Sequence, residues 1–459
     1  MKHSFNPTIL REYDIRGIVG DTLTEADAYA LGRVYATKAR AEGARTVAVG
    51  RDGRTHSGML EAELIEGLTE GGLDVVQIGM GPSPMLYFAT HYLDVDGGIQ
   101  VTGSHNPADY NGFKLLLNGR SVYGAEIQEL GERAASGHWH QGSGRVEEVD
   151  IRAAYADRLL QGFSGKPFHV GWDAGNGATG PILDMLIDRL PGQHHAIFTK
   201  VDGTFPNHHP DPTVEANLEH LKALVADRQL DFGIAFDGDG DRIGAVDGKG
   251  RVIWGDQLLM ILAEAMLRDE PGATIIADVK ASQTLFDRVA ELGGKPVMWK
   301  TGHSLIKTKM KETGAPLAGE MSGHIFFAHR WYGFDDALYA AVRLIEAVSA
   351  SGKSLTEIMD EMPKSVATPE MRFPVDEPRK FAIVDEVRDR LSGEGAKVDA
   401  TDGVRVSTSD GWWLLRASNT QDVLVARAEA KDDAGVERLV AQIDDQLAKS
   451  GVKRVEAVH

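Results

Sequence analysis

The chain of 459 residues carries a formal net charge of −19 and contains no cysteine. The negative charge argues against nucleic-acid or anionic-membrane partners, because both are bound by basic surfaces that neutralise phosphates. Without cysteine the protein has no disulfides and no thiolate metal site. No apolar stretch is long enough to span a bilayer, and Met1 to Thr8 lacks the apolar core of a secretory signal. We therefore expect a cytoplasmic protein, and the acidic charge does not exclude a small phosphate ester as its substrate.

Apolar runs that end in polar loops recur along the first part of the chain. The runs cover residues 46–50, 97–101, 169–172, 232–236 and 274–277. Helical periodicity extends over residues 24–42, and further helix-like segments cover 181–190 and 255–267. This alternation predicts repeated α/β units with largely parallel sheets. Ligands of such sheets bind beyond the carboxyl ends of the strands, so we expect the polar loops to gather there.

The pattern changes after about Pro363. Short strands are predicted over residues 404–408, 412–416 and 423–428, and an amphipathic helix over 434–449. These elements indicate a smaller α+β domain at the carboxyl end. The length suits about three or four domains. We place the boundaries so that the domains cover residues 1–150, 151–251, 252–363 and 364–459.

The polar stretch Thr102 to Pro107 follows directly on the run 97–101. A serine in a loop at a strand end, such as Ser104, can act as a nucleophile or carry a phosphoryl group. Gly103 permits close approach of a ligand, and Pro107 prevents a helix from absorbing the loop. Taken alone, this composition is also typical of an ordinary turn, so its assignment depends on the rest of the chain.

Three carboxylates alternate with glycine in the segment Asp237 to Arg242, which lies between two apolar runs. Asp237, Asp239 and Asp241 would point to one side of an extended chain, and the glycines let the backbone curl so that they converge. Such crowding favours a bound cation, and oxygen ligands suit Mg2+. A calcium-binding EF-hand loop is excluded, because it requires glycine in place of Arg242 and an acidic residue in place of Gly248. A solvated acidic hairpin tip stays open as the simpler alternative.

A competing signal is the glycine pattern Gly175 to Gly180, which follows a predicted strand and precedes a predicted helix. Dinucleotide-binding folds use this spacing, with an acidic residue such as Asp202 on the ribose. The motif is weak by itself, and tight packing between strand and helix explains it better than a nicotinamide site. His208 and His209 could form a metal pair, but adjacent histidines tend to point apart, and a polar loop explains them better.

Two further polar loops carry groups suited to a phosphorylated sugar. The loop Gly319 to His324 places Glu320 and Ser322 close enough to bond neighbouring sugar hydroxyls. The loop Arg416 to Thr420 combines a guanidinium with hydroxyl, amide and backbone donors, which suits a phosphate. Each loop taken singly is equally well explained as an ordinary capped or turning loop.

These four loops, which begin at Thr102, Asp237, Gly319 and Arg416, resemble in their order the α-D-phosphohexomutase superfamily, specifically its bacterial phosphomannomutase/phosphoglucomutase branch. The resemblance spans nearly the whole chain. It implies an α/β fold in which three related α/β domains with mixed sheets and a smaller C-terminal α+β domain surround a central cleft. In chain order, the domains would carry a phosphoserine loop, a metal-binding loop, a sugar-binding loop and a phosphate-binding loop.

The resemblance also implies roles for individual residues. Those that would act in catalysis are Ser104, His105, Lys114, Arg242 and His324. Those that would hold Mg2+ are Ser104, Asp237, Asp239 and Asp241. Those that would bind the substrate are Tyr13, Arg16, Lys280, His303, Glu320, Ser322, Arg416, Ser418, Asn419 and Thr420. Within this last group, Glu320 and Ser322 would contact sugar hydroxyls, and the loop from Arg416 would hold the non-reacting phosphate.

The implied activity is reversible phosphoryl transfer between the 1- and 6-positions of mannose or glucose phosphates. Phospho-Ser104 would donate to one sugar hydroxyl, and the resulting hexose 1,6-bisphosphate would reorient before its opposite phosphate returns to Ser104. His105, Lys114 or His324 would transfer the proton, and positive charge from Lys114, Arg242 and Mg2+ would favour the transfer. Glucose 1,6-bisphosphate or mannose 1,6-bisphosphate would serve as activator, and we expect a monomer or weak dimer.

Three alternative functions stay open. Phosphoglucosamine mutases of the superfamily usually carry Gln where this chain has Met321, so this position favours mannose or glucose. A Mg-dependent phosphohydrolase with Asp237 as nucleophile would leave Ser104 and Glu320 unexplained. A non-catalytic sugar-phosphate binding protein would explain the clamping loops, but neither the aspartates nor a reactive serine.

Overall fold

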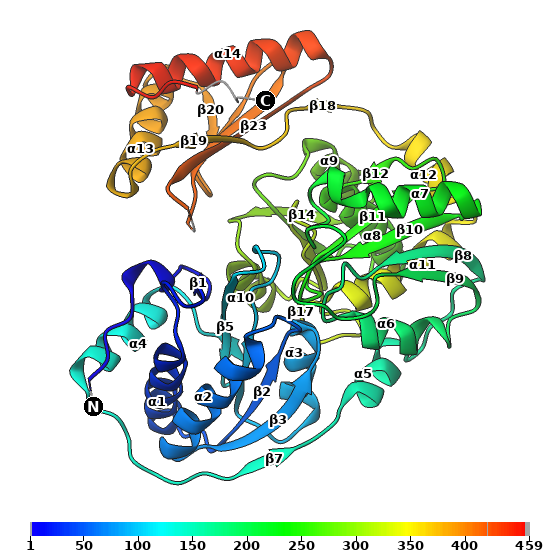
Figure 1. The fold of residues 1–459 in the computed structure, drawn as a ribbon. Coiled ribbons are helices and arrows are strands. Elements are labelled where there is room, and N and C mark those ends of the chain that lie inside the picture. The colour runs from blue at the N-terminus through cyan, green and yellow to red at the C-terminus, as the bar shows by residue number, and fades with distance from the viewer. Residues whose placement is uncertain (1, 420, 455–459) are drawn as a thin grey trace.

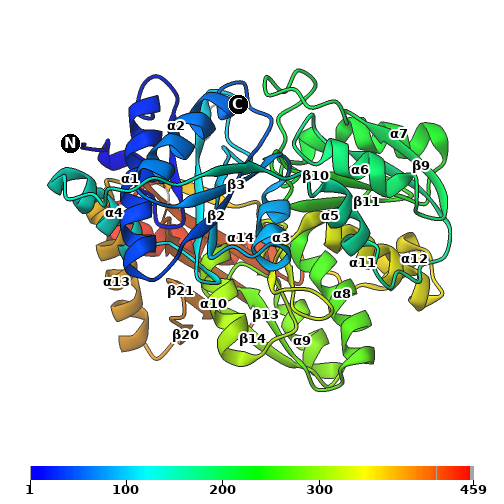
Figure 2. The ribbon, with the colours of Figure 1, turned by 90° about the horizontal axis from the view of Figure 1, so that it is seen from below.

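The computed structural model of the protein describes residues 2–419 and 421–454, which form four β-sheets with helices packed on them (Figure 1). Three sheets are built from the chain up to Asp335, and the fourth from the chain starting at Val366. Seen from below, the first three units lie side by side with the fourth behind them (Figure 2). This is the predicted four-domain architecture, and the boundaries at residues 150, 251 and 363 stay a proposal. No helix of the described ranges is long and apolar enough to cross a membrane.

The first unit contains a seven-stranded sheet in the order β1-β5-β4-β2-β3-β7, with β6 paired to β5. Its strands are β1 (Ile15–Ile18), β2 (Thr46–Arg51), β3 (Asp74–Met80), β4 (Gly97–Val101), β5 (Tyr110–Leu117), β6 (Arg120–Ser121) and β7 (Val146–Glu148). Its helices are η1 (Pro7–Ile9), α1 (Glu25–Ala41), α2 (Ser57–Glu70), α3 (Ser83–Tyr92) and α4 (Ala125–Ser136). A capping box between Thr24 and Asp27 starts α1 where the periodicity predicted a helix.

The second unit contains a five-stranded sheet in the order β12-β11-β10-β8-β9. Its strands are β8 (Phe168–Asp173), β9 (Gly192–Ile197), β10 (Phe232–Phe236), β11 (Ile243–Asp247) and β12 (Val252–Ile253). Its helices are α5 (Arg152–Leu159), α6 (Gly180–Ile187), η2 (Glu215–Leu218) and α7 (Glu219–Arg228). The apolar run 232–236 forms β10, which is buried along its whole length, as expected of a strand covered on both faces.

The third unit contains a five-stranded sheet in the order β14-β13-β15-β16-β17. Its strands are β13 (Thr274–Asp278), β14 (Lys295–Trp299), β15 (Leu317–Gly319), β16 (Ile325–Phe327) and β17 (Phe334–Asp335). Its helices are α8 (Gly255–Asp269), α9 (Gln283–Glu291), α10 (His303–Thr313), α11 (Ala337–Ser351) and α12 (Leu355–Glu361).

The fourth unit contains a six-stranded antiparallel sheet in the order β18-β23-β22-β21-β20, with β19 paired to β23. Its strands are β18 (Val366–Ala367), β19 (Met371–Pro374), β20 (Lys397–Asp399), β21 (Val404–Ser407), β22 (Gly411–Ala417) and β23 (Val423–Ala430). Its helices are α13 (Glu377–Gly393) and α14 (Asp433–Lys449). The three strands and the final helix predicted after Pro363 are all present.

In each of the first three sheets, a polar loop joins an inner strand to an antiparallel neighbour. The antiparallel pairs are β4 with β5, β10 with β11, and β15 with β16. The sheets are therefore mixed, as the family resemblance implies, and the expectation of largely parallel sheets is wrong for these pairs. The physical reason is that each connection is a short loop, whereas a parallel neighbour needs a long crossover.

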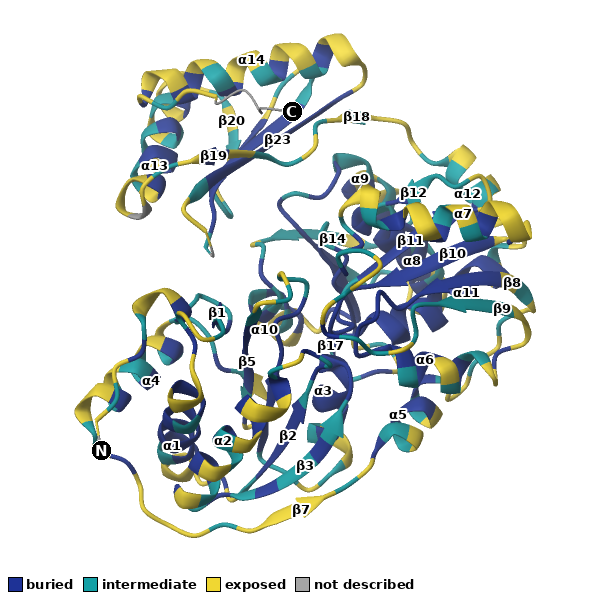
Figure 3. Ribbon diagram, in the orientation of Figure 1, coloured by how far each residue is buried: buried dark blue, intermediate teal, exposed yellow. Residues whose placement is uncertain are grey.

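Buried apolar residues of the first three units form one connected core. Figure 3 marks the buried segments of these units in dark blue. The core includes Phe88 of α3, Trp172 of β8 and Leu338 of α11, so helices and strands of three sheets share it. The first unit also has a core of its own, and so does the fourth. A small apolar cluster that includes Val279 and Trp412 lies between the third and fourth units. The fourth unit is thus joined to the rest through a smaller apolar contact.

Asp336 caps α11 at the junction between the third unit and α5. Its carboxylate accepts hydrogen bonds from the Tyr339 N–H at 2.9 Å and from the Tyr155 hydroxyl at 2.7 Å. Burial raises the pKa of Asp336 to about 7. The folded protein therefore binds this proton more tightly than the unfolded chain does. It follows that the contribution of Asp336 to stability falls as the pH rises from about 4 to about 7.

The variant Asp336→Asn is expected to melt at a higher temperature than the parent at pH 8, with a smaller gain at pH 5. At pH 8 the parent has to bury an ionised carboxylate, whereas the amide stays neutral. For a domain of about 150–250 residues, each kcal/mol gained raises the melting temperature by roughly 2–4 °C. Thermal scans at the two pH values measure the effect. The control Asp432→Asn changes the exposed cap of α14 and should show no gain that grows with pH, and equal gains for Asp336→Asn at both values would contradict the raised pKa.

Candidate active site

Ser104 lies in the loop between β4 and β5, and it is 3% exposed. Its backbone φ of 50° falls in the left-handed region, which residues with a side chain seldom adopt. The Thr102 hydroxyl accepts a hydrogen bond from the Ser104 N–H at 2.8 Å. The Ser104 hydroxyl lies 3.1 Å from Nδ1 of His105 and donates to Asp237 Oδ2 at 3.1 Å. The first unit thereby presents its serine directly to the aspartate loop of the second.

The aspartate loop between β10 and β11 is folded around Asp237. Its Oδ1 accepts hydrogen bonds from the backbone N–H groups of residues 240 to 242, at 2.9, 3.1 and 3.1 Å. These bonds curl the chain and bring the three carboxylates together. Asp239 and Asp241 both form ion pairs with the Lys114 ammonium of β5, with a separation of 2.6 Å for Asp239. The predicted convergence of the aspartates is confirmed.

The three aspartates have the properties expected of a divalent-cation site. Burial and the neighbouring carboxylates of Asp241 and Asp239 raise the pKa of Asp237, because each ionised group disfavours the others. Within the described chain, Asp239 Oδ1 is buried without a hydrogen-bond partner, and Asp241 Oδ1 lies 3.3 Å from His324 Nε2. Carboxylate oxygens in this arrangement are ligands that Mg2+ takes. Asp237, Asp239 and Asp241 could therefore hold such an ion, with the Ser104 hydroxyl beside it.

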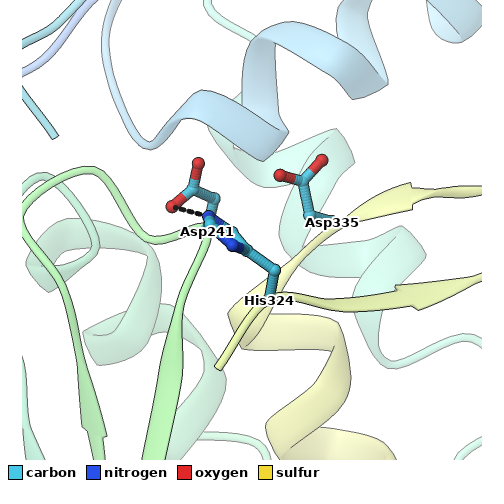
Figure 4. A group of neighbouring side chains, drawn as sticks. All are labelled: Asp241, His324 and Asp335. Carbon is cyan, nitrogen blue, oxygen red and sulfur yellow. Dashed lines mark ion pairs between the residues drawn. The ribbon is translucent and has the colours of Figure 1, made fainter. Parts of the chain in front are cut away.

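His324 connects the sugar-binding loop to the aspartate loop. Its Nδ1 lies 2.9 Å from Glu320 Oε2, and its Nε2 lies 3.3 Å from Asp241 Oδ1. Burial lowers the pKa of His324, but Asp241 and Glu320 outweigh that effect and raise it to about 9. The ring is therefore cationic at neutral pH. Figure 4 shows it beside Asp241, with the Asp335 carboxylate nearby on the adjacent strand.

The other two candidates for proton transfer differ in charge. Burial, together with the charges of Arg242 and Arg16, lowers the pKa of His105 well below its usual range, so its ring is neutral. Burial would also lower the pKa of Lys114, but the carboxylates of Asp239 and Asp241 raise it above its usual range. A neutral base and two cations thus surround the Ser104 hydroxyl and the aspartate loop.

The predicted phosphate-binding loop of the fourth unit contacts the first unit. Asn419 Nδ2 donates to the Tyr13 hydroxyl at 2.7 Å, and this hydroxyl donates to the Thr301 carbonyl at 2.8 Å. Arg416 is buried and forms an ion pair of 2.9 Å with Asp402. Ser418 is buried directly after β22, and Thr420 lies outside the described residues. Hydrogen bonds therefore connect the first, third and fourth units at this point.

The remaining predicted residues surround the same loops. Arg16 donates to Asn106 Oδ1 at 2.6 Å and so contacts the Ser104 loop. The His303 ring lies between those of Tyr13 and His324, with centroid distances of 5.9 and 5.8 Å. The Lys280 ammonium lies 3.4 Å from a Glu370 carboxylate oxygen.

The structure also places the rest of the sugar and aspartate loops. Arg242 forms an isolated β-bridge with His324, which joins the two loops. Ser322 Oγ lies 3.0 Å from Nδ1 of the same ring, and Glu320 accepts the Gly302 N–H at 2.6 Å. The serine, aspartate and sugar loops are thus in direct contact. Lys280 and Arg416 instead form ion pairs with Glu370 and Asp402, which lie outside these loops.

Several residues of the site were not predicted from the sequence. Ser83, at the start of α3, donates its hydroxyl to Asp239, and no local pattern marks it. Asp335 pairs with Lys307 at 3.2 Å beside His324. Asp278 accepts the Met321 N–H at 3.1 Å and so positions the sugar loop. Asp278 directly follows the predicted strand 274–277, and this signal could have identified it.

The competing glycine pattern has a structural explanation. A Cβ on Gly180 would lie 1.8 Å from the Thr199 carbonyl oxygen, and one on Gly177 would lie 2.8 Å from the Gly238 carbonyl oxygen. Close chain packing therefore accounts for these glycines, as expected, and it replaces the nicotinamide interpretation. His208 forms an ion pair with Asp173 at 2.9 Å.

A cavity of about 250 Å³ lies elsewhere, between helices of the third unit. Its lining includes Met260 and Arg268 of α8, Arg288 of α9 and Ile358 of α12. None of the loops that carry predicted site residues takes part in this lining. We therefore give the cavity no part in the site.

The site brings together a buried serine, a cluster of carboxylates and several cations. Loops at the strand ends of three related sheets, together with the fourth unit, supply these groups. This combination is suited to phosphoryl transfer. Comparison with known families then places the chain. Models of the phosphoglucomutase/phosphomannomutase family match it as alpha/beta/alpha domain I over residues 7–140, domain II over 153–250, domain III over 254–366 and the C-terminal domain over 370–446. The chain belongs to this family, within the α-D-phosphohexomutase superfamily.

Individual relatives are similar over nearly the whole chain. The phosphomannomutase/phosphoglucomutase of Pseudomonas aeruginosa is 47% identical over 442 residues, which cover 96% of this chain and 95% of the relative. The phosphoglucomutase of Neisseria gonorrhoeae is 44% identical over 446 residues, covering 95% and 96%. The crystal structure of a phosphoglucomutase/phosphomannomutase family protein from Burkholderia thailandensis superposes with a TM-score of 0.93 at 42% identity, covering 98% of this chain and 99% of that one.

Proposed function

We propose that the protein is a hexose phosphate mutase that moves a phosphoryl group between the 1- and 6-positions of glucose or mannose phosphates. The observation that carries the proposal is the hydrogen bond of 3.1 Å from the Ser104 hydroxyl to Asp237 Oδ2. This contact brings the proposed phosphate carrier of the first unit against the proposed metal ligands of the second. A non-catalytic binding protein has no need of a buried serine at this place.

Transfer begins at phospho-Ser104. The bond between phosphorus and the Ser104 oxygen breaks and a bond to the sugar oxygen forms. His105, which is neutral, can accept the sugar hydroxyl proton, and Lys114 or His324, which are cationic, can donate a proton to the Ser104 oxygen. The hexose 1,6-bisphosphate then reorients, and its opposite phosphate returns to Ser104. Lys114 and Arg242 place positive charge beside the transferring group, where negative charge is spread over its oxygens.

Asp237, Asp239 and Asp241, together with the Ser104 oxygen, are the proposed ligands of Mg2+. Bound there, the ion supplies charge neutralisation at the transferring phosphoryl group. Glucose 1,6-bisphosphate or mannose 1,6-bisphosphate is the proposed activator, because it can phosphorylate a free Ser104. Asp237 itself holds the loop in shape through the backbone hydrogen bonds described above.

Substrate recognition is assigned to the loops of the third and fourth units. Glu320 and Ser322 bond sugar hydroxyls, and the segment Arg416 to Thr420 holds the phosphate that does not react. Because the fourth unit has a core of its own, it can adjust its position and serve both orientations of the bisphosphate. The remaining substrate contacts are proposed for Tyr13, Arg16, Lys280 and His303. We expect a monomer or weak dimer.

The protein is expected to convert glucose 1-phosphate into glucose 6-phosphate when incubated with Mg2+ and a trace of glucose 1,6-bisphosphate. Mannose 1-phosphate should also react, and Met321 predicts at least about a tenfold lower kcat/KM for glucosamine 1-phosphate. Enzymatic measurement of each 6-phosphate product tests this. A preference for glucosamine would make the protein a phosphoglucosamine mutase, free phosphate as main product would favour a phosphohydrolase, and no turnover would favour a binding role.

A further inference from the structure

The Arg54 side chain lies against the Ser104 loop and is fully buried. Its Nη2 donates hydrogen bonds to the carbonyl oxygens of Ser104 and Asn106, at 2.8 and 2.6 Å. Its Nη1 donates to the carbonyl oxygens of Pro107 and Tyr110, at 2.5 and 3.0 Å. One guanidinium therefore binds four carbonyl groups between Ser104 and the start of β5.

Asp52 holds the other side of the same loop. Its Oδ2 accepts hydrogen bonds from the Thr102 hydroxyl at 2.8 Å and from the Gly103 N–H at 3.1 Å. Its Oδ1 accepts the Arg54 N–H at 3.0 Å, so the two side chains are fixed to each other. The turn after β2 thus binds the Ser104 loop through two side chains. Asp52 accepts hydrogen bonds from donors of the loop, and Arg54 donates hydrogen bonds to its carbonyl oxygens.

The backbone of Ser104 requires such support. Its φ of 50° is unfavourable for a residue with a side chain, and such conformations cost on the order of 1–3 kcal/mol. They persist where the surroundings over-determine them. If the loop relaxed, Ser104 would return to an ordinary conformation, and its hydroxyl would turn away from Asp237.

Arg54 and the loop fit together closely. A Cβ on Gly103 would lie 2.4 Å from Arg54 Nε, so a larger residue before Ser104 would collide with the guanidinium. On its other side, the Phe205 ring of the second unit covers the guanidinium, with its centroid 5.1 Å from Cζ. Arg54 therefore has little freedom to move, and the loop that it binds is equally restrained.

We propose that Arg54 is a positioning residue for phosphoryl transfer, because the carbonyl groups that it binds set the direction of the Ser104 hydroxyl. The inference rests on the proposed role of Ser104 as phosphate carrier. Arginine is required because its planar fork offers donors to several acceptors at fixed angles, whereas the lysine ammonium is a compact point charge. A loosened loop lowers the rate of transfer, while the sugar and phosphate loops keep the substrate affinity nearly unchanged.

Arg54→Lys and Arg54→Met test the proposal. We expect kcat to fall by roughly 10- to 100-fold, the usual effect of a misplaced reacting group, with KM changed by less than about threefold. Purified phosphoenzyme mixed with glucose 1-phosphate in a single turnover should lose its phosphate more slowly by a similar factor, followed by intact mass. A wild-type rate in Arg54→Lys would overturn the proposal. A lower kcat/KM that results from a raised KM with unchanged kcat would also overturn it.

Arg33→Met provides a matched control for general destabilisation. Arg33 is also a buried arginine of the first unit, donates to the His140 carbonyl at 3.1 Å and pairs with Glu70 at 2.9 Å. It should lower the melting temperature but leave the single-turnover rate of the folded enzyme unchanged. If Arg33→Met slowed the transfer as much as Arg54→Met, the effect of Arg54 would be one of stability alone, and the proposal would be wrong.

The Ser104→Ala variant separates this inference from the proposed function. If Ser104→Ala kept its activity, the phosphoserine mechanism itself would fail, whatever the Arg54 variants did. If Ser104→Ala were inactive while both Arg54 variants transferred phosphate at the normal rate, the positioning role alone would fail.

Discussion

Ser104→Ala is expected to lose mutase activity by roughly a thousandfold or more, the scale seen when a nucleophile is removed from a catalytic unit. The variant lacks the oxygen that carries the phosphoryl group between the two transfers. The substitution removes the hydroxyl and its contacts with His105 and Asp237. The fold should persist, because alanine fits the same space. The measurement is the conversion of glucose 1-phosphate, together with the melting temperature and intact mass of the variant.

Ser83→Ala is the matched control for that experiment. It also removes a serine hydroxyl that bonds an aspartate of the same loop, in this case Asp239. Since Ser83 carries no phosphate in the proposed mechanism, its variant should keep activity within about tenfold of the parent, the expected effect of one lost hydrogen bond. Full activity in Ser104→Ala would remove the serine from the mechanism.

Removal of divalent cations with a chelator is expected to abolish activity, and added Mg2+ should restore it. Asp239→Asn should raise the Mg2+ concentration for half-maximal activity by about tenfold or more, because a charged oxygen ligand is replaced by a neutral amide. The parent should also gain thermal stability as Mg2+ is added, since the ion binds the folded state. This second readout is independent of turnover.

Asp247→Asn is the control for the metal experiment. Asp247 is a fully buried aspartate at the other end of the same β-hairpin, where it accepts the Lys249 N–H at 3.0 Å. Its variant should keep the Mg2+ midpoint of the parent. If Asp239→Asn also kept that midpoint, the aspartate loop would not be the metal site.

Local patterns predicted the elements that depend on neighbouring residues. The runs 97–101 and 232–236 are the strands β4 and β10, and the periodic segment from Thr24 is α1. Apolar patterns and helix caps each involve residues that are only a few positions apart. Both signals can therefore be read directly from the sequence. The curl of the aspartate loop is equally local, since Asp237 accepts N–H groups three to five residues further on.

The contacts that build the site act over far longer separations. Lys114 meets Asp239 and Asp241 from 125 and 127 residues away, and Asn419 meets Tyr13 from 406. The family resemblance named these residues as site positions, but not which of them touch. Arg54 carried no signal of its own, because its partners are carbonyl groups, which every residue has.

By itself, the sequence determined the reactive groups of this protein and their order: a serine, three aspartates, a sugar loop and a phosphate loop, each at the end of a strand. It did so because turns, caps and strand ends depend on short-range sterics and hydrogen bonding. The tertiary structure decided that each motif loop returns as an antiparallel strand, that Ser104 adopts a left-handed backbone against Asp237, and that Arg54 holds it there. These features depend on packing between units distant in the chain, which no local pattern records.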